Sequence, residues 1–473
     1  MDNLSYRELY APGHFGNSYE IMADFQMREV LQEAKSWGFN AYGDWLDCAD
    51  LRDPFNNPYH EWLLPQAIWE RKVTNFKIAQ EVGLQTNLCV TPNHVYLDQL
   101  ASDILADRSG GRIQGQLICP SKPAGREIVL RNQRNVFKSL KDRGIRLDAI
   151  SACPYDYGGC NCPACRPWIL TFGKLAVEIH EIAKEYFPDI KARLIGWWWT
   201  VQEHDLFKEW ADREAHGRFV SMAAHIPYGE TRPAAVKLPE GCELHAFVHI
   251  GYAEKASPRD VYGPWGPVIA PNRLARTVYE LKGIECKGYM AYSEGLLDDL
   301  NKALLGALSS GKSADSRSVL AEYSDKYFGA RGWDRKAWAA WLVKWGEPWG
   351  VDVVPARKEF DRLAEDAPPS WRLAQWEAKL RIFEAHAEAS KGDQWGKARL
   401  AAGDRFFLER DKLYREVWQL GLVRHVLHPR YHPPSWLSDW QKTCLADGAA
   451  FRHPHAGRGD DPRAAYRGDP ILG

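Results

Sequence analysis

Residues 168–199 read WILTFGKLAVEIHEIAKEYFPDIKARLIGWWW and contain one complete unit of the fold. The first part, Trp168 to Tyr186, spaces its apolar residues three and four apart, which is the period of an amphipathic helix. The Pro-Asp pair at 188–189 then ends the helix, because proline cannot continue it. The run Ile190 to Ile195 has the aliphatic content of a buried strand and leads into Gly196 and three tryptophans. This stretch therefore predicts a helix, a stop and a strand.

The same unit recurs along the chain. Helices are expected at residues 22–37, 66–82, 124–142, 168–186, 205–214 and 272–281. Strands are expected at Glu8–Pro12, Phe39–Tyr42, Leu84–Val90, Arg146–Ala152, Ile190–Ile195, Arg218–Ala224, Glu243–His249 and Lys287–Ala291. Helices alternating with strands favour a parallel sheet, and eight strands are the number of a (β/α)8 TIM barrel. An open doubly wound sheet is the alternative, but the glycine-rich phosphate loop expected after its first strand is missing.

The chain changes character beyond about residue 310. Between residues 318 and 427 the strand patterns give way to helical ones, as at 372–389 and 403–420. A chain of 473 residues also exceeds the length at which one hydrophobic core usually stops growing. We therefore predict a barrel over residues 1–312, an α-helical domain over 313–445 and a flexible tail over 446–473.

The charge balance and the hydropathy exclude several classes of partner. The sequence has 61 Lys and Arg against 62 Asp and Glu, a formal net charge of -1, with no long run of one sign. Neither nucleic acid nor a membrane surface is therefore expected as a partner. No stretch approaches the roughly 20 apolar residues that span a bilayer, and no signal-peptide pattern opens the chain. We expect a cytoplasmic protein, or a secreted or periplasmic one if a signal peptide has been removed; the oligomeric state is not specified.

In a TIM barrel the functional side chains lie where the strands end, at the carboxyl face. Carboxylates, imidazoles and aromatic rings dominate these positions here. The predicted catalytic residues are Asp156 and Glu294, with Asp44 in reserve. The predicted substrate-binding residues are His14, Trp45, Asn93, His94, Tyr155, Trp197, Trp199, His225, His249, Tyr252 and Tyr292.

This mixture of side chains suits the cleavage of a glycosidic bond. One carboxyl protonates the leaving oxygen, a second acts as nucleophile or base, and aromatic faces hold the sugar rings. Asp156 and Glu294 each lie within two residues of a tyrosine and follow an apolar strand that would desolvate the carboxyl and raise its pKa. Each residue lies near a helix start, so a capping role is the alternative. The interpretation predicts an oligosaccharide or glycoconjugate substrate and no cofactor for catalysis.

Two other functions fit the same barrel. A metal-dependent hydrolase or sugar isomerase would use as ligands His14, Asp44, His94 and His225. The HxH ligand pair that a metal-dependent amidohydrolase carries on its first strand is missing. A non-catalytic sugar-binding protein would bind carbohydrate without turnover.

Four cysteines crowd between positions 153 and 165. Cys160, Cys162 and Cys165 form a CxCxxC motif close to a helix start, a spacing that tetrahedral zinc sites use, with Cys153 as the expected fourth ligand. A site saturated by thiolates would hold a structural zinc rather than activate water. A disulfide or reduced thiols are the alternatives.

Four phrases carry a resemblance to a known group of proteins: LICPSKP (117–123), CPYDYGGCNCPACRPW (153–168), GYMAYSEGLLDDLNKAL (288–304) and LAEYSDKYFG (320–329). They resemble barrel glycoside hydrolases of a group that includes the α-glucuronidases, the β-N-acetylglucosaminidases and uncharacterised bacterial relatives with a helical domain behind the barrel. The resemblance implies an acidic pair at strand ends, which falls on Asp156 and Glu294. Tyr157 follows Asp156, which departs from the paired Asp-Glu of the β-hexosaminidases.

Overall fold

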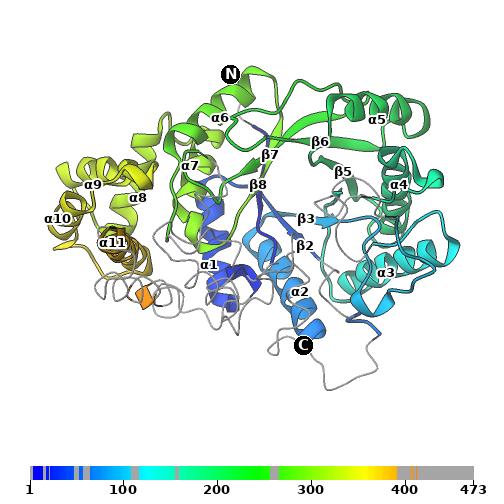
Figure 1. Ribbon diagram of the computed structural model, residues 1–473, viewed down its shortest axis with the longest axis horizontal. Coiled ribbons are helices and arrows are strands. Elements are labelled where there is room, and N and C mark those ends of the chain that lie inside the picture. Colours follow the sequence, from blue (N-terminus) through cyan, green and yellow to red (C-terminus); the bar gives the residue numbers. More distant parts are fainter. Residues whose placement is uncertain are drawn as a thin grey trace.

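The computed structural model describes residues 4–13, 17–20, 22–46, 53–56, 64–107, 117–154, 159–255, 266–390, 405, 408, 409 and 412. Within these residues, eight parallel strands close into a barrel in sequence order, as Figure 1 shows. The strands are β1 (Tyr6–Tyr10), β2 (Ala41–Trp45), β3 (Gln85–Val90), β4 (Ala149–Ala152), β5 (Lys191–Gly196), β6 (Phe219–His225), β7 (Glu243–His249) and β8 (Gly288–Tyr292). The predicted (β/α)8 barrel is confirmed.

Helices surround the barrel and connect most successive strands. They are α1 (Asp24–Trp37), α2 (Leu64–Val82), α3 (Pro123–Asp142), α4 (Trp168–Tyr186), α5 (Val201–Glu214), α6 (Pro271–Gly283) and α7 (Asp299–Ser310). Residues 226–242 join β6 to β7 without a helix. Helix α5 begins earlier than predicted because Thr200 caps it: its hydroxyl accepts a hydrogen bond from the backbone N–H of Glu203 at 3.2 Å.

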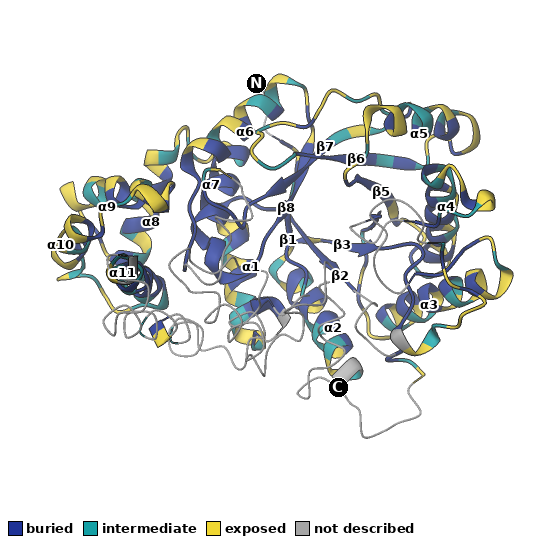
Figure 2. Ribbon diagram, viewed as in Figure 1, coloured by how far each residue is buried: buried dark blue, intermediate teal, exposed yellow. Residues whose placement is uncertain are grey.

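Each barrel helix buries one face against the strands and exposes the other, as Figure 2 shows for α3 and α4. In α4 the side chains of Phe172, Ala176, Ile179 and Ala183 are buried, and their spacing of three and four residues puts them on one stripe. The helix ends at Tyr186, as the proline at position 188 predicts. None of the described helices combines the length and apolar composition that a membrane crossing needs.

The helical region after the barrel contains α8 (Ser316–Phe328), α9 (Trp333–Lys344), α10 (Val353–Ala364) and α11 (Trp371–Ser390). Figure 1 shows these helices on one side of the barrel, beside α1 and α7. The Trp37 ring of α1 stacks on Tyr323 of α8, and Arg372 of α11 forms a buried ion pair with Asp299 of α7. A group of fully buried tryptophans fills this region: Trp338, Trp341, Trp345 and Trp376. Most of the predicted helix at 403–420 and the tail at 446–473 fall outside the described residues, and the predicted domain boundaries stay predictions.

The interior of the barrel has a polar layer and an aromatic layer. Near the amino ends of the strands, the Glu8 carboxylate accepts hydrogen bonds from Tyr6 and, at 2.8 Å, from Asn87. The Arg193 guanidinium donates to Ser221 at 2.9 Å and lies 3.9 Å from the centroid of the Tyr6 ring. Near the carboxyl ends the buried side chains are apolar or aromatic and include Tyr10, Trp45, Ile195, Phe247, Met290 and Tyr292. The aromatic layer therefore separates the polar network from the mouth of the barrel.

Candidate active site at the barrel mouth

Aromatic and imidazole rings gather at the carboxyl ends of β5 to β8. The Trp197 ring lies 4.5 Å from His225, and His225 lies 5.3 Å from His249, measured between ring centroids. His249 in turn lies 5.7 Å from Tyr252 and 6.0 Å from Tyr292. All five residues were predicted to bind substrate, and the structure brings them together. With Trp198 and Tyr228, which also contact these rings, we call this set the mouth cluster.

The two histidines of the mouth cluster contact each other directly. The Nε2 atoms of His225 and His249 are 3.1 Å apart, so one ring donates and the other accepts. Burial lowers the pKa of His249 well below its ordinary value, and the positive charges of His225 and Arg273 lower it further. The His249 ring therefore stays neutral, so the pair does not bury two adjacent cations.

The loop after β7 is held in place by side chains from the helices behind it. Arg273 of α6 donates to the backbone carbonyls of His249, Tyr252 and Ala253 at 2.9, 3.0 and 3.2 Å. Asn301 of α7 donates to the Tyr252 carbonyl at 3.0 Å. Burial lowers the pKa of Arg273 to about 10, although Glu254 opposes the shift. These bonds satisfy carbonyls that a buried loop would otherwise leave unpaired.

Glu294 lies directly after β8, and its backbone is fixed by a buried ion pair. The Glu294 N–H donates to Asp298 at 2.7 Å, and the Ser293 hydroxyl donates to the same carboxylate at 2.8 Å. The Lys302 ammonium lies 2.7 Å from Asp298 and donates to the Gly295 carbonyl at 2.6 Å. The side chains of Asp298 and Lys302 are almost completely buried. This network determines the direction in which the chain leaves the strand.

The turn after β8 depends on the charge pairing of Asp298 with Lys302 and on a glycine at position 295. Burial raises the pKa of Asp298 against the opposing charge of Lys302. Burial disfavours the Lys302 ammonium, but Asp298 more than compensates and raises the pKa of Lys302 above its ordinary value. Gly295 has a φ of 117°, and a Cβ there would lie 2.1 Å from the Ser18 hydroxyl oxygen, so the turn requires glycine.

The Glu294 side chain lies beside the loop after β7. A Cβ on Gly251 would lie 2.5 Å from the Glu294 Cγ, so glycine makes room for this side chain. Glu294 is 7% exposed, which leaves the carboxyl largely desolvated while it adjoins the loop that carries His249 and Tyr252. This carboxyl is therefore placed next to the mouth cluster.

The three tryptophans after β5 point in three directions. Trp197 lies inside the barrel mouth, whereas Trp199 packs on Phe172 and Phe207 of the helix layer. Trp199 was predicted to bind substrate, and its side chain instead faces the helices. Trp198 is 43% exposed, lies 4.6 Å from the His225 ring and has a φ of 58°. A positive φ is unusual for a bulky residue, and such strain clusters at binding sites. Trp198 is therefore the ring of this run that a ligand can reach.

Of the residues predicted after β2 and β3, Trp45 shares a buried apolar cluster with Trp197 and Tyr292, whereas Asp44 and Asn93 contact other parts of the barrel. Asp44 points to the helix layer, where Lys72 of α2 lies 2.8 Å from its carboxylate, because successive strand residues face opposite sides of the sheet. This buried ion pair shows that Asp44 stabilises the packing of α2 on the barrel, and its catalytic role stays a prediction. Trp45 is fully buried and stacks on His94 at 6.2 Å. Asn93 donates to a backbone carbonyl within the loop after β3 at 3.2 Å.

Three predicted residues lie outside the described residues: His14, Tyr155 and Asp156. The chain is described up to Pro154, which follows β4, and again from Gly159. The assignment of Asp156 as a catalytic carboxyl stays a prediction.

One group of potential metal ligands converges among the described residues. The sulfur atoms of four cysteines lie within 4.8 Å of one another: Cys119, Cys160, Cys162 and Cys165. The predicted CxCxxC ligands are therefore together, but the fourth member is Cys119, from the loop after β3, rather than the predicted Cys153. Cys153 follows β4 and is buried in the aromatic layer of the barrel. Cys119 lies 41 residues before Cys160, a separation that no local spacing rule detects.

The ligands of the metal-dependent alternative do not form such a group. Asp44 is paired with Lys72, His94 stacks on Trp45, and His225 contacts His249. Across the described part of the chain, no other set of three His, Cys, Asp or Glu side chains converges as a metal site requires. The positions of Asp44, His94 and His225 therefore do not support a metal-dependent hydrolase or sugar isomerase.

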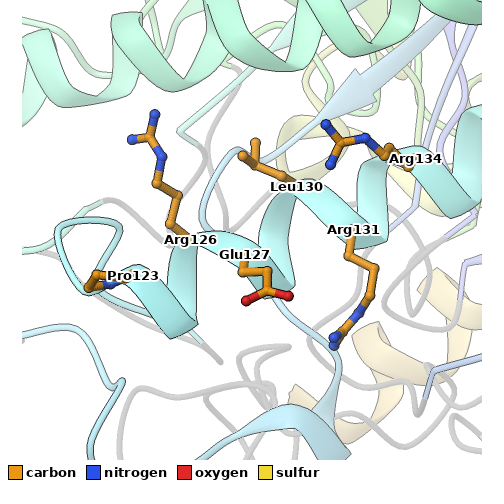
Figure 3. A pocket seen from close by; sticks show the side chains of 6 residues that line it. All are labelled: Pro123, Arg126, Glu127, Leu130, Arg131 and Arg134. Atoms are coloured by element: carbon orange, nitrogen blue, oxygen red, sulfur yellow. The ribbon is translucent and has the colours of Figure 1, made fainter.

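A hollow of about 440 Å³ lies on the outer surface of the barrel, away from the mouth cluster. Figure 3 shows that its described lining residues all belong to α3: Pro123, Arg126, Glu127, Leu130, Arg131 and Arg134. Arg126 is already engaged in an ion pair with Glu178 of α4. A hollow described along a single helix does not bring groups together for chemistry, so we assign no site to it.

Sequence reasoning missed most of the residues that support the mouth: Tyr228, Arg273, Asp298, Asn301 and Lys302. One signal was available, since the phrase LLDDLNK places Asp298 and Lys302 four residues apart within an apolar helix, where a charged pair is expected to be buried together. Arg273 and Asn301 act through backbone carbonyls that are distant in sequence, and no local pattern marks them.

No protein-family model and no curated protein matches this sequence. The chain is similar to a GH5_18 protein from Streptomyces cattleya in complex with Manβ1-4GlcNAc, at 13% identity over 65% of this chain and 80% of that chain, with a TM-score of 0.42. It is similar to the catalytic domain of β-amylase from Paenibacillus polymyxa, at 10% identity over 66% and 99%, with a TM-score of 0.41. A third neighbour is α-L-fucosidase isoenzyme 2 from Paenibacillus thiaminolyticus, at 12% identity over 71% and 56%, with a TM-score of 0.41. These neighbours are glycoside hydrolases, but at 10–13% identity and TM-scores of 0.41–0.42 the likeness does not assign a function to this chain, because one fold hosts many chemistries.

Proposed function

We propose that the protein is a glycoside hydrolase that cleaves an O-glycosidic bond at the carboxyl face of its barrel. The observation that carries the proposal is the placement of Glu294. Its carboxyl is desolvated, its backbone is fixed by the Asp298–Lys302 ion pair, and it adjoins the aromatic and imidazole rings of the mouth cluster. A buried carboxyl at a fixed position beside aromatic rings suits a general acid that must be held against a glycosidic oxygen.

The mouth cluster supplies the groups that would hold a carbohydrate. Trp198 presents an exposed ring face on which a sugar ring can stack, and it lies beside the paired rings of His225 and His249. Tyr228 and Tyr252 add two hydroxyl groups that lie 3.4 Å apart. The proposed substrate is therefore an oligosaccharide or a glycoconjugate, and the proposed chemistry needs no cofactor.

The second carboxyl in the proposal is Asp156. Its support is its place in the chain, two residues after Pro154 and so just past the carboxyl end of β4. Strands β4 and β8 are four positions apart in an eight-stranded barrel and so lie on opposite sides of it. Carboxyls about 6.5–9.5 Å apart leave room for a water molecule and give inversion, whereas about 5 Å gives retention. Placement on opposite sides favours the longer separation, and we therefore propose an inverting reaction.

The resemblance of four phrases to the α-glucuronidase and β-N-acetylglucosaminidase group narrows the proposed substrate. Two of those phrases contain Asp156 and Glu294, the proposed acid pair. Aryl glycosides of glucuronic acid, N-acetylhexosamines, sialic acid and neutral hexoses would identify the sugar, and we expect hydrolysis of at least one of the first two classes.

Amide variants test the roles of the two carboxyls. Glu294→Gln and Asp156→Asn should each lower kcat at least about 10²-fold while the melting temperature stays close to that of the wild type, because the amide keeps the shape and removes the proton. Glu243→Gln is the matched control, since Glu243 lies at the opposite end of the barrel, at the start of β7, and should keep full activity. Full activity of Glu294→Gln would refute its role. Carbohydrate binding without hydrolysis of any glycoside would indicate a sugar-binding protein instead.

A further inference from the structure

The four-cysteine group has the dimensions of a metal site. The Cys119 sulfur lies 3.6 Å from that of Cys162 and 3.7 Å from that of Cys165, and all four sulfurs lie within 4.8 Å of one another. In a tetrahedral zinc site with Zn–S distances of about 2.3 Å, the sulfurs are about 3.8 Å apart. A disulfide would bring two sulfurs to about 2.05 Å, and none of these cysteines is in one. The observed separations therefore fit four ligands of one ion.

We propose that Cys119, Cys160, Cys162 and Cys165 bind one structural zinc ion. Thiolate sulfurs are the ligands that structural zinc sites use, and four of them leave no position open for water or substrate. The site would therefore stabilise the structure rather than take part in chemistry. This proposal does not depend on the proposed hydrolase function.

The groups around the sulfurs suit bound thiolates. The Asp107 N–H donates to the Cys160 sulfur at 3.3 Å, and the Ser121 hydroxyl lies 2.8 Å from the Cys119 sulfur. The Asn161 N–H donates to the Asp107 carbonyl at 2.9 Å, which ties the two loops together beside the sulfurs. Hydrogen bonds of this kind orient metal ligands and moderate the charge on them. Without an ion, four weakly hydrogen-bonding thiols would crowd together with little to hold them.

The proposed zinc would join two loops at the mouth of the barrel. Cys119 belongs to the loop after β3 and lies four residues before α3, whereas Cys165 lies three residues before α4. Three of the four cysteines are buried in the same apolar cluster as Trp45 and Trp197. The ion would therefore fasten the starts of two barrel helices to the aromatic layer. Cys160 also lies four residues after Asp156, so the zinc would fix the chain just beyond the proposed catalytic carboxyl.

The first experiment measures metal in the full chain, produced in zinc-supplemented medium and purified without chelators. Elemental analysis should find about one zinc per chain, and X-ray absorption at the zinc edge should show four sulfur ligands at about 2.3 Å. Removal of the zinc should lower the melting temperature, and added zinc should restore it. Protein that neither contains zinc nor takes it up after reduction would overturn the proposal, as would iron in its place or a disulfide between two of the four cysteines.

Two serine variants separate this ligand set from the one that sequence spacing predicts. Cys119→Ser should lose most of its zinc or bind it at least tenfold more weakly, with three sulfur ligands in whatever zinc remains. Cys153→Ser is the matched control, because Cys153 is also fully buried and close in sequence to the motif but lies outside the four-cysteine group. It should keep one zinc with four sulfur ligands. Loss of zinc from Cys153→Ser with full retention by Cys119→Ser would overturn the assignment. If Cys119→Ser fails to fold, Cys119→His keeps a zinc ligand at this position and should give three sulfurs and one nitrogen in the absorption spectrum. Four sulfurs in Cys119→His would equally overturn the assignment.

Discussion

Glu8 should make the stability of this protein depend on pH in an unusual direction. The carboxyl lies in the polar layer inside the barrel, fully buried. Burial raises its pKa from 4.5 to about 7, against the opposing effects of the Tyr6 hydrogen bond and the Arg193 charge. The change to test is Glu8→Gln, which keeps an oxygen that can accept hydrogen bonds from Tyr6 and Asn87.

The magnitude follows from the difference between the folded and unfolded pKa values. Between pH 4.5 and 7 the unfolded chain ionises Glu8 while the folded protein keeps it protonated, so the folded state binds more protons. The contribution of Glu8 to the free energy of unfolding therefore falls as pH rises through this window and is constant above about pH 7. A shift from 4.5 to about 7 corresponds to a total loss of about 3 kcal/mol.

Urea unfolding followed by tryptophan fluorescence at pH 5, 6, 7 and 8 measures this loss. The stability of Glu8→Gln relative to the wild type should rise by about 2–3 kcal/mol from pH 5 to pH 8. The pKa values of His204 and His245 are lowered by burial to about 4 and about 3, which makes stability rise with pH. These residues are unchanged in the variant, so the difference between the two proteins isolates Glu8. Parallel pH profiles would show that Glu8 is ionised in the folded protein and would refute the reasoning.

Two further predictions concern the mouth of the barrel. Lys302→Met should lower the free energy of unfolding by about 3–5 kcal/mol, because it leaves Asp298 buried without its partner. The control is Lys138→Met, which breaks an exposed ion pair of the same spacing and should leave stability almost unchanged. Equal losses of stability in urea unfolding would contradict this prediction. Trp198→Gly should raise KM roughly 5- to 100-fold on the identified substrate without loss of melting temperature, because glycine suits a φ of 58° and removes the stacking ring. The control is Trp333→Ala, because the Trp333 ring is 77% exposed but belongs to α9, outside the barrel, and its loss should leave KM unchanged. An unchanged KM for Trp198→Gly would show that the sugar binds elsewhere.

The sequence was sufficient to predict the barrel because each strand has its own local signal, a short apolar run between residues that favour turns. The helix ending at Tyr186 and the strand β7 have the bounds expected from their patterns, and the other strands begin or end within a few residues of the expected positions. The largest differences are in β2, expected at residues 39–42 and observed at Ala41–Trp45, and in β4, where the strand expected from Arg146 pairs only from Ala149. Strand pairing depends on the partner strand, so a pattern of apolar residues along one segment cannot locate where the pairing starts.

The site was less predictable because it depends on side-chain direction and on contacts between distant segments. The rule that strand ends carry function selected Trp197, His225, His249, Tyr252 and Tyr292, and the structure places them together. The same rule selected Asp44, but a shift of one residue along a strand turns a side chain from the barrel to the helices. Cys119 and Cys160 meet across two loops, and no spacing within either loop reveals that contact.

The two buried ion pairs near the mouth are better explained by the backbone groups that they hold in place than by a gain in folding stability. Burying an ion pair costs desolvation free energy that its Coulomb attraction often fails to recover, so apolar residues would serve as well for folding alone. The Asp298–Lys302 pair fixes the backbone on both sides of Glu294 after β8. Asp44 and Lys72 do the same after β1, where the Gly13 N–H donates to Asp44 at 3.2 Å and Lys72 donates to the Gly13 carbonyl at 3.1 Å. Both pairs bind the loops that leave the strands rather than the strands themselves. Asp44, expected to be a reserve catalyst, thus holds the backbone of Gly13 in place just after β1.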